Sequence, residues 1–89
     1  MKILTVCGMG SGSSLILKMN VEEVLSGLGK DAEVDACDIG SVAGHQVDLL
    51  ISTKEFGDQL EEFTADKILV SNVVDKSDIE QQLKDYLAK

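Results

Sequence analysis

The sequence predicts an α/β fold, a three-layer structure in which helices cover both faces of a four-stranded parallel sheet. Three observations support this prediction. Short apolar runs typical of strands buried on both faces recur along the chain, and helix-periodic segments alternate with them. A turn rich in glycine and serine directly follows the first run. We expect the strand order 2-1-3-4 with right-handed crossovers, in which the end of strand 1 lies at the switch point where ligands bind.

The first strand and the first helix have the clearest patterns. Residues 2–7 form a short strand that ends at Cys7, and a helix follows the glycine-rich turn. The helix carries an apolar stripe at i, i+4, i+7, i+8 and i+11, which consists of Leu17, Val21, Val24, Leu25 and Leu28. Gly27 and Gly29 close this helix, and Gly29 is the better candidate for its left-handed cap.

Three further strands are predicted, over residues 32–38, 47–52 and 67–71. Residues 39–46 form a connection with room for a helical turn. The S-x-x-E spacing that begins at Ser52, and again at Ser77, predicts two capping boxes, each of which opens a helix. The inward faces of these two helices are predicted to be Phe56, Leu60 and Phe63 in the first, and Ile79, Leu83, Tyr86 and Leu87 in the second.

Composition limits the class of protein. The 89 residues suffice for one small domain, which we assign to 1–89, and the net charge is −8. This charge disfavours nucleic acid and anionic lipid as partners but suits docking to a basic protein surface. We see no leader and no apolar run of the ~20 residues that a membrane span needs. We therefore expect a cytoplasmic protein without direct membrane insertion.

The most informative feature is the thiol at the start of the glycine-rich turn. We predict Cys7 as the catalytic residue, and the following seven residues as a P-loop-like cradle for phosphate: Gly8, Met9, Gly10, Ser11, Gly12, Ser13 and Ser14. Backbone N–H groups and a helix N-terminus bind anions and can stabilise a nucleophilic thiolate. The alternatives are that Cys7 is only a small buried apolar residue and that the glycines only permit a sharp turn.

Related phosphate-binding motifs do not fit this turn. Lys18 lies too far into the helix for a nucleotide-binding P-loop, and Ser13 replaces the third glycine of a dinucleotide fingerprint. A small tyrosine-phosphatase loop, C-x5-R, requires arginine at position 13, and the sequence contains no arginine. The turn therefore suits a site that accepts a phosphoryl group and passes it on better than one that hydrolyses phosphate esters.

The remaining candidates have simpler interpretations. His45 is expected to be an exposed loop residue, and Cys37 a packing residue in a strand next to Cys7. The two cysteines and one histidine form neither a disulfide framework nor a zinc site, and we expect no metal and no cofactor. Asp38 is interpreted as a cap or turn residue, and the acidic run 58–62 as a solvated helix face.

The segment from Cys7 to Met19, Cys-Gly-Met-Gly-Ser-Gly-Ser-Ser-Leu-Ile-Leu-Lys-Met, resembles the start of enzyme IIB components of the bacterial sugar phosphotransferase system (PTS). It is most similar to the ascorbate-type branch, where the cysteine loop leads into a Lys-Met and acidic stretch, here residues 18–23. The resemblance implies a phosphorelay. A phosphohistidine on a IIA component phosphorylates the cysteine, which corresponds to Cys7. The phosphocysteine then donates to a sugar-like substrate, L-ascorbate in this branch, held by the membrane IIC transporter.

A second function class stays open from the sequence. The same turn can bind phosphate or sulfate reversibly in a non-catalytic regulatory module, in which the Cys7 thiol keeps an ordinary pKa. In the carrier hypothesis the pKa of Cys7 is expected to be depressed. A redox role is weaker, since no resolving cysteine lies next to Cys7.

Overall fold

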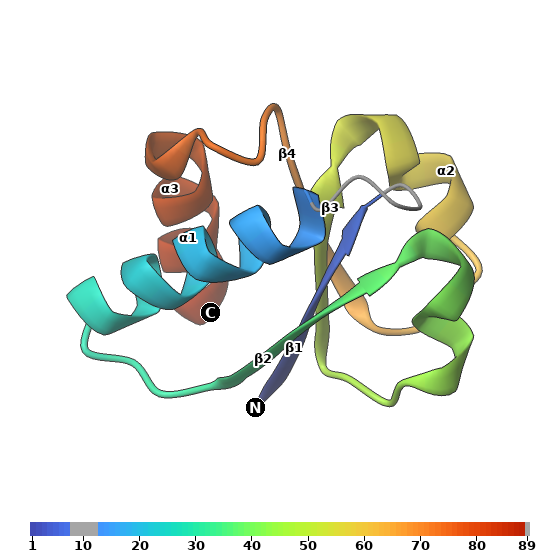
Figure 1. The fold of residues 1–89 in the computed structure, drawn as a ribbon. Coiled ribbons are helices and arrows are strands. Elements are labelled where there is room, and N and C mark those ends of the chain that lie inside the picture. Colours follow the sequence, from blue (N-terminus) through green and yellow to red (C-terminus); the bar gives the residue numbers. More distant parts are fainter. Residues whose placement is uncertain (8–12, 89) are drawn as a thin grey trace.

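A computed structural model describes residues 1–7 and 13–88 of the chain. Four parallel strands form one sheet in the order β2-β1-β3-β4, which confirms the predicted fold class and strand order (Figure 1). The elements in chain order are β1 (Lys2–Cys7), α1 (Ser13–Gly27), β2 (Glu33–Asp38), the 3-10 helix η1 (Ile39–Gly44), β3 (Leu49–Thr53), the 3-10 turn η2 (Lys54–Phe56), α2 (Gly57–Leu60), β4 (Asp66–Val70) and α3 (Lys76–Leu87).

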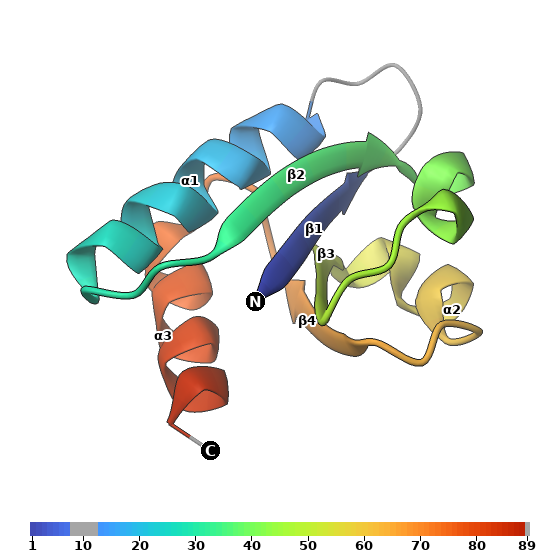
Figure 2. The same ribbon diagram turned by 90° about the horizontal axis from the view of Figure 1, so that it is seen from below.

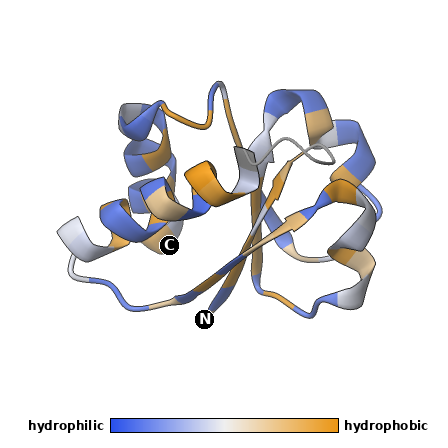
Figure 3. Ribbon diagram, in the orientation of Figure 1, coloured by the Kyte–Doolittle hydropathy of each residue, from blue (hydrophilic) through white to orange (hydrophobic). Residues whose placement is uncertain are grey.

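The sheet separates two layers of helices. α1 and α3 lie side by side on one face, and η1 and α2 lie on the other, as the two perpendicular views show (Figures 1 and 2). Apolar side chains of the strands pack in both directions, so that hydrophobic colour runs along the sheet between the two layers (Figure 3). Burial on both faces explains why the strand sequences are short continuous apolar runs.

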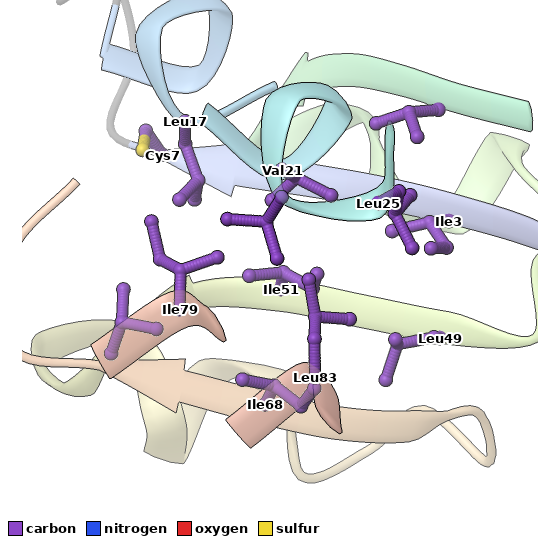
Figure 4. Close-up of a cluster of buried hydrophobic side chains, with 13 residues drawn as sticks. Ile3, Cys7, Leu17, Val21, Leu25, Leu49, Ile51, Ile68, Ile79 and Leu83 are labelled. Carbon is purple, nitrogen blue, oxygen red and sulfur yellow. The ribbon is translucent and has the colours of Figure 1, made fainter. Parts of the chain in front are cut away.

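The larger core cluster lies between the sheet and the pair α1 and α3. Leu17, Val21 and Leu25 of α1 are at most 3% exposed, and they face Ile79 and Leu83 of α3 (Figure 4). Each such side chain contributes about 1.5–3 kcal/mol through burial. The helical stripes predicted from the sequence are therefore the core-facing sides of α1 and α3.

α1 ends as its glycine pattern predicts. Gly29 has a positive φ of 69°. The N–H of Lys30 donates to the carbonyl of Leu25 at 2.9 Å, and the N–H of Gly29 donates to that of Ser26 at 3.1 Å. These two bonds form a Schellman motif, in which the left-handed residue is usually glycine.

Both predicted capping boxes are wrong. Ser52 lies inside β3, where its hydroxyl donates to the carbonyl of Val6, and η2 begins after Thr53. α3 begins two residues earlier than its S-x-x-E spacing indicates, because the N-cap is Asp75, whose side chain accepts a hydrogen bond from the Asp78 N–H at 3.2 Å. Ser52 does not cap a helix because it is paired within the sheet, and Ser77 does not cap α3 because Asp75 already does so.

The remaining differences concern short elements. β2 begins one residue later than predicted, β3 two residues later, and β4 one residue earlier. The connection predicted over residues 39–46 does contain a helical turn, the 3-10 helix η1. α2 is shorter than predicted: Leu60 is fully buried, Phe56 is half-buried, and Phe63 packs on the core from beyond the end of the helix.

Candidate active site

Cys7 is the last residue of β1, at the carboxyl end of the sheet. β1 lies between β2 and β3, so it ends at the switch point of the sheet, and the next described element, α1, begins at Ser13. Cys7 faces the layer of α1 and α3 and belongs to the same buried cluster as Leu17 (Figure 4). This is the position at which open α/β sheets bind ligands.

The sheet divides beside Cys7. The pairing of β1 with β3 ends at Thr5 and Ile51. β1 continues to pair with β2 as far as Cys7 and Asp38, and β3 with β4 as far as Thr53 and Val70. At the point of separation Ser52 Oγ donates a 2.6 Å hydrogen bond to the Val6 carbonyl, so a side chain connects the two strands directly beyond their last paired residues.

Burial disfavours the thiolate form of Cys7. The residue is 2% exposed. Burial raises the pKa of the Cys7 thiol, and the negative charge of Glu55 on η2 raises this pKa further. Both effects disfavour a thiolate. The expectation of a depressed Cys7 pKa is therefore wrong, because desolvation and the charge of Glu55 both raise this pKa.

The predicted phosphate cradle lies mostly outside the described residues, which applies to Gly8, Met9, Gly10, Ser11 and Gly12. Ser13 is the first residue of α1. Ser14 lies in the first turn of that helix, and its carbonyl accepts a 2.8 Å hydrogen bond from the hydroxyl of Thr5 on β1. The start of α1 is thus connected by a side chain to the strand that carries Cys7.

Cys37 does not join the site. In the register of β1 and β2, Cys37 pairs with Val6, and its side chain packs on the cluster of the opposite face. Both cysteines are free thiols. Because they lie on opposite faces of the sheet, a bond between them is disfavoured. Cys37 is a packing residue, as predicted, and burial raises the pKa of its thiol.

Asp38 and His45 also have the simple roles predicted for them. Asp38 ends β2 opposite Cys7 in register and occupies the N-cap position of η1, without a side-chain capping bond. His45 is exposed and lines a hollow with Lys2 and Asp48 at the amino ends of the strands, away from Cys7. The charged residues of the run 58–62 are exposed.

Three residues near Cys7 have no counterpart among the predicted site residues: Thr5, Ser52 and Glu55. Thr5 and Ser52 do leave a signal in the sequence, since each is a hydroxyl residue within or at the end of a buried apolar run. Glu55 leaves none, because its proximity to Cys7 depends on β1 and β3 being neighbours.

Two further properties follow from the described part of the chain. No helix in it is long and apolar enough to cross a membrane. Residues 1–7 and 13–88 bring no three histidine, cysteine or carboxylate side chains together as a potential metal site.

Comparison with known proteins identifies the family. The model of the family described as "PTS system, Lactose/Cellobiose specific IIB subunit" matches residues 2–85. The chain belongs to this PTS IIB family. PTS IIB components are phosphotransferase modules that work with IIA and IIC partners, so the chain has a role in sugar phosphotransfer.

Relatives of this IIB chain include proteins with a narrower description. The "Ascorbate-specific PTS system EIIB component" of Mycoplasma pneumoniae is 33% identical over 88 residues, which cover 96% of this chain and 93% of the relative. The protein of the same description from Escherichia coli O157:H7 is 46% identical over 39 residues, 44% of this chain and 39% of the relative.

The IIB fold is also found by structural comparison. The lactose-specific IIB domain of Streptococcus pneumoniae matches with a TM-score of 0.63 over 99% of this chain and 95% of that one. The two sequences are 18% identical, so this match concerns the fold alone.

Proposed function

We propose that residues 1–89 act in the cytoplasm as one phosphocarrier unit, in which Cys7 is the covalent acceptor. The donor is a phosphohistidine on a IIA component, and the final acceptor is a hydroxyl of a sugar-like substrate held by a membrane IIC transporter. Gly8 to Ser14 bind the phosphoryl group. The observation that carries this proposal is the position of Cys7 at the switch point of the sheet, directly before the segment that leads into α1.

Each transfer step exchanges one bond to phosphorus for another. In the first step the bond between Cys7 Sγ and phosphorus forms as the N–P bond of the phosphohistidine breaks, and the thiol proton passes to the departing imidazole nitrogen. In the second step a substrate hydroxyl attacks phosphorus, the S–P bond breaks, and the hydroxyl proton returns to sulfur. Both steps need in-line positioning and stabilisation of charge more than a strong general base.

The raised pKa of Cys7 is compatible with this chemistry. A resting thiol carries the proton that the departing imidazole requires, so no separate acid is needed in the first step. A thiol that is neutral at rest also protects the nucleophile from unwanted alkylation and oxidation, because the thiolate is the reactive form.

We further propose L-ascorbate as the substrate of the system. The relative that matches nearly the whole chain is described as ascorbate-specific. The family description names lactose and cellobiose instead, so these sugars are the natural comparison in a test.

The function is tested by incubating the chain with a radiolabelled phospho-IIA component of an ascorbate-type system. We expect label on Cys7 as an acid-tolerant, iodine-labile adduct. Cys37→Ser is the matched control and is expected to label like the parent, since Cys37 lies on the opposite face of the sheet. A Cys7→Ser variant that still took up label would exclude the carrier mechanism. Reversible phosphate binding without any transfer would favour the regulatory module.

The substrate is tested with membranes that contain the matching IIC transporter. Addition of L-ascorbate is expected to remove the label from Cys7, whereas lactose and cellobiose leave it in place. Release of the label by lactose or cellobiose alone would contradict the substrate assignment while leaving the carrier role intact.

A further inference from the structure

Two polar side chains are fully buried in the part of the chain that the structure describes, Thr5 and Ser52, both 0% exposed. Buried hydroxyl groups in strands are costly unless they form hydrogen bonds, and valine or alanine would fill the same space without that cost. Both hydroxyls do form hydrogen bonds, one to the carbonyl of Val6, directly before Cys7, and one to the carbonyl of Ser14 at the start of α1. Packing alone therefore does not explain why Thr5 and Ser52 occupy these two positions.

Ser52 holds the strand end that carries Cys7. Its hydroxyl donates at 2.6 Å to the carbonyl of Val6, the residue directly before Cys7. The bond lies just beyond the last residue pair of β1 with β3, where β1 would otherwise be tied to β2 alone. It thus restrains Cys7 from the β3 side.

Thr5 holds the start of α1 against β1. Its hydroxyl lies 2.8 Å from the carbonyl of Ser14 in the first turn of α1, and 3.2 Å from that of Asp35 on β2. A hydroxyl has one proton, and the shorter contact identifies Ser14 as the main acceptor. The bond connects β1 to α1 across the stretch of chain that includes Cys7.

We infer that Thr5 and Ser52 are positioning residues for phosphoryl transfer at Cys7. The Ser52 hydroxyl holds Val6, the residue before Cys7, against β3, and the Thr5 hydroxyl holds Ser14 of α1 against β1. In-line transfer depends steeply on this placement, because a shift of about 1 Å can reduce a rate by about a hundredfold. The inference rests on the proposed carrier role of Cys7.

The first test compares Thr5→Val and Ser52→Ala, which remove the hydroxyls, with Thr5→Ser, which keeps one. We expect the single-turnover rate of transfer from phospho-IIA to fall about tenfold in the first two variants, with little change in the half-saturating concentration of IIA. Thr5→Ser is expected to retain most of the rate. If Thr5→Val does not fold, Ser52→Ala, the smaller change, carries the test.

Ile68→Val is the matched control for stability. Ile68 lies on β4 in the same core cluster as Cys7, and its substitution removes one buried methylene without touching either hydrogen bond. We expect its transfer rate to equal that of the parent. Transfer rates of Thr5→Val and Ser52→Ala that match Ile68→Val would overturn the inference.

A second readout does not depend on phosphoryl transfer. In a Cys37→Ser background, iodoacetamide reports only the Cys7 thiol. We expect several-fold faster alkylation in Thr5→Val and Ser52→Ala than in the parent, and no change in Ile68→Val, because the first two variants loosen a buried thiol. If this shift occurs but the parent takes no label from phospho-IIA, the carrier function fails, and only the restraint of the Cys7 thiol by the two hydroxyls stands. If alkylation is unchanged while the parent is labelled normally, the positioning role fails.

Discussion

The carboxylate of Glu55 acts on the thiol of Cys7, and its charge raises the pKa of that thiol. The two residues are 48 positions apart in the sequence. The charge acts across this separation because β3, which leads into η2, is the direct neighbour of β1 in the sheet. The same charge would also oppose the negative charge of a phosphoryl group on Cys7, so Glu55 is suited to keep the proposed phosphocysteine reactive.

Glu55→Gln is expected to lower the pKa of Cys7, while burial, the larger cause, still holds it above the usual range. The pH profile of Cys7 alkylation in a Cys37→Ser background measures this change, and its midpoint should move to lower pH. The shift should shrink at high salt, since Glu55 is exposed. Glu61→Gln, an exposed glutamate beyond α2, is the control, and an equal shift in both variants would contradict the role of Glu55.

The two glycines at the end of α1 are expected to respond in opposite directions to alanine. Gly29 has a φ of 69°, so Gly29→Ala should destabilise the protein by about 1 kcal/mol. Gly27 is helical with nothing within 4 Å of an added Cβ, so Gly27→Ala should be neutral or stabilise by up to about 1 kcal/mol. Urea denaturation of both variants measures the difference. Equal destabilisation by both variants would show that the positive φ of Gly29 does not determine the effect of alanine on stability.

Asp75 is expected to be the residue that caps α3. Asp75→Ala should cost about 1 kcal/mol of unfolding free energy, because the Asp78 N–H loses its acceptor at the helix N-terminus. Ser77→Ala, the exposed position that the S-x-x-E pattern indicates, should change stability by less than about 0.5 kcal/mol. Thermal or urea unfolding distinguishes the two variants. A larger loss of stability in Ser77→Ala than in Asp75→Ala would show that Ser77, and not Asp75, caps α3.

Tyr86 is expected to make stability depend on alkaline pH. Its phenol donates a 2.7 Å hydrogen bond to Asp66, which raises the pKa of Tyr86 from 10.0 to about 12. A raised pKa in the folded state means that the stabilisation is fully present below pH 10 and is lost as the pH rises towards 12. The advantage of the wild type over Tyr86→Phe should therefore shrink in this window.

Direct titration provides the check on Tyr86. It is the one tyrosine of the sequence, so phenolate absorbance reports it alone. Asp66→Asn should move the midpoint back towards 10, because Asp66 is the main cause of the shift. Asp48→Asn should move it less, since Asp48 acts only through its charge and is the smallest cause. A midpoint near 10 in the wild type would show that the bond to Asp66 does not form in solution.

The parts of the fold that depend on local pattern were predictable. β1 has the bounds that its apolar run indicates, α1 buries its predicted stripe, and Gly29 takes the left-handed conformation. These features depend on side-chain periodicity and on glycine's freedom at positive φ, which are properties of neighbouring residues. The position of Cys7 at the switch point was predictable for the same reason, once the strand order was inferred.

The sequence predictions failed where a residue interacts with a distant segment of the chain instead of following its local pattern. Ser52 has the spacing of a helix cap, but its hydroxyl bonds to Val6 of a neighbouring strand. Cys7 follows the pattern of an activated thiol, but burial and Glu55 raise its pKa. No local rule contains these effects, because the partners, Val6 on β1 and Glu55 on η2, belong to other elements of the fold.

The sequence by itself determined the α/β class, the strand order, the helix faces and the cysteine at the carboxyl end of β1. Periodicity and turn chemistry encode these features along the chain. Only the tertiary structure decided the direction in which the pKa of Cys7 shifts and the hydrogen bonds around Cys7, those of Thr5 with Ser14 and of Ser52 with Val6. The physical reason is that desolvation, charge and buried hydrogen bonds act through space between strands that the sequence separates.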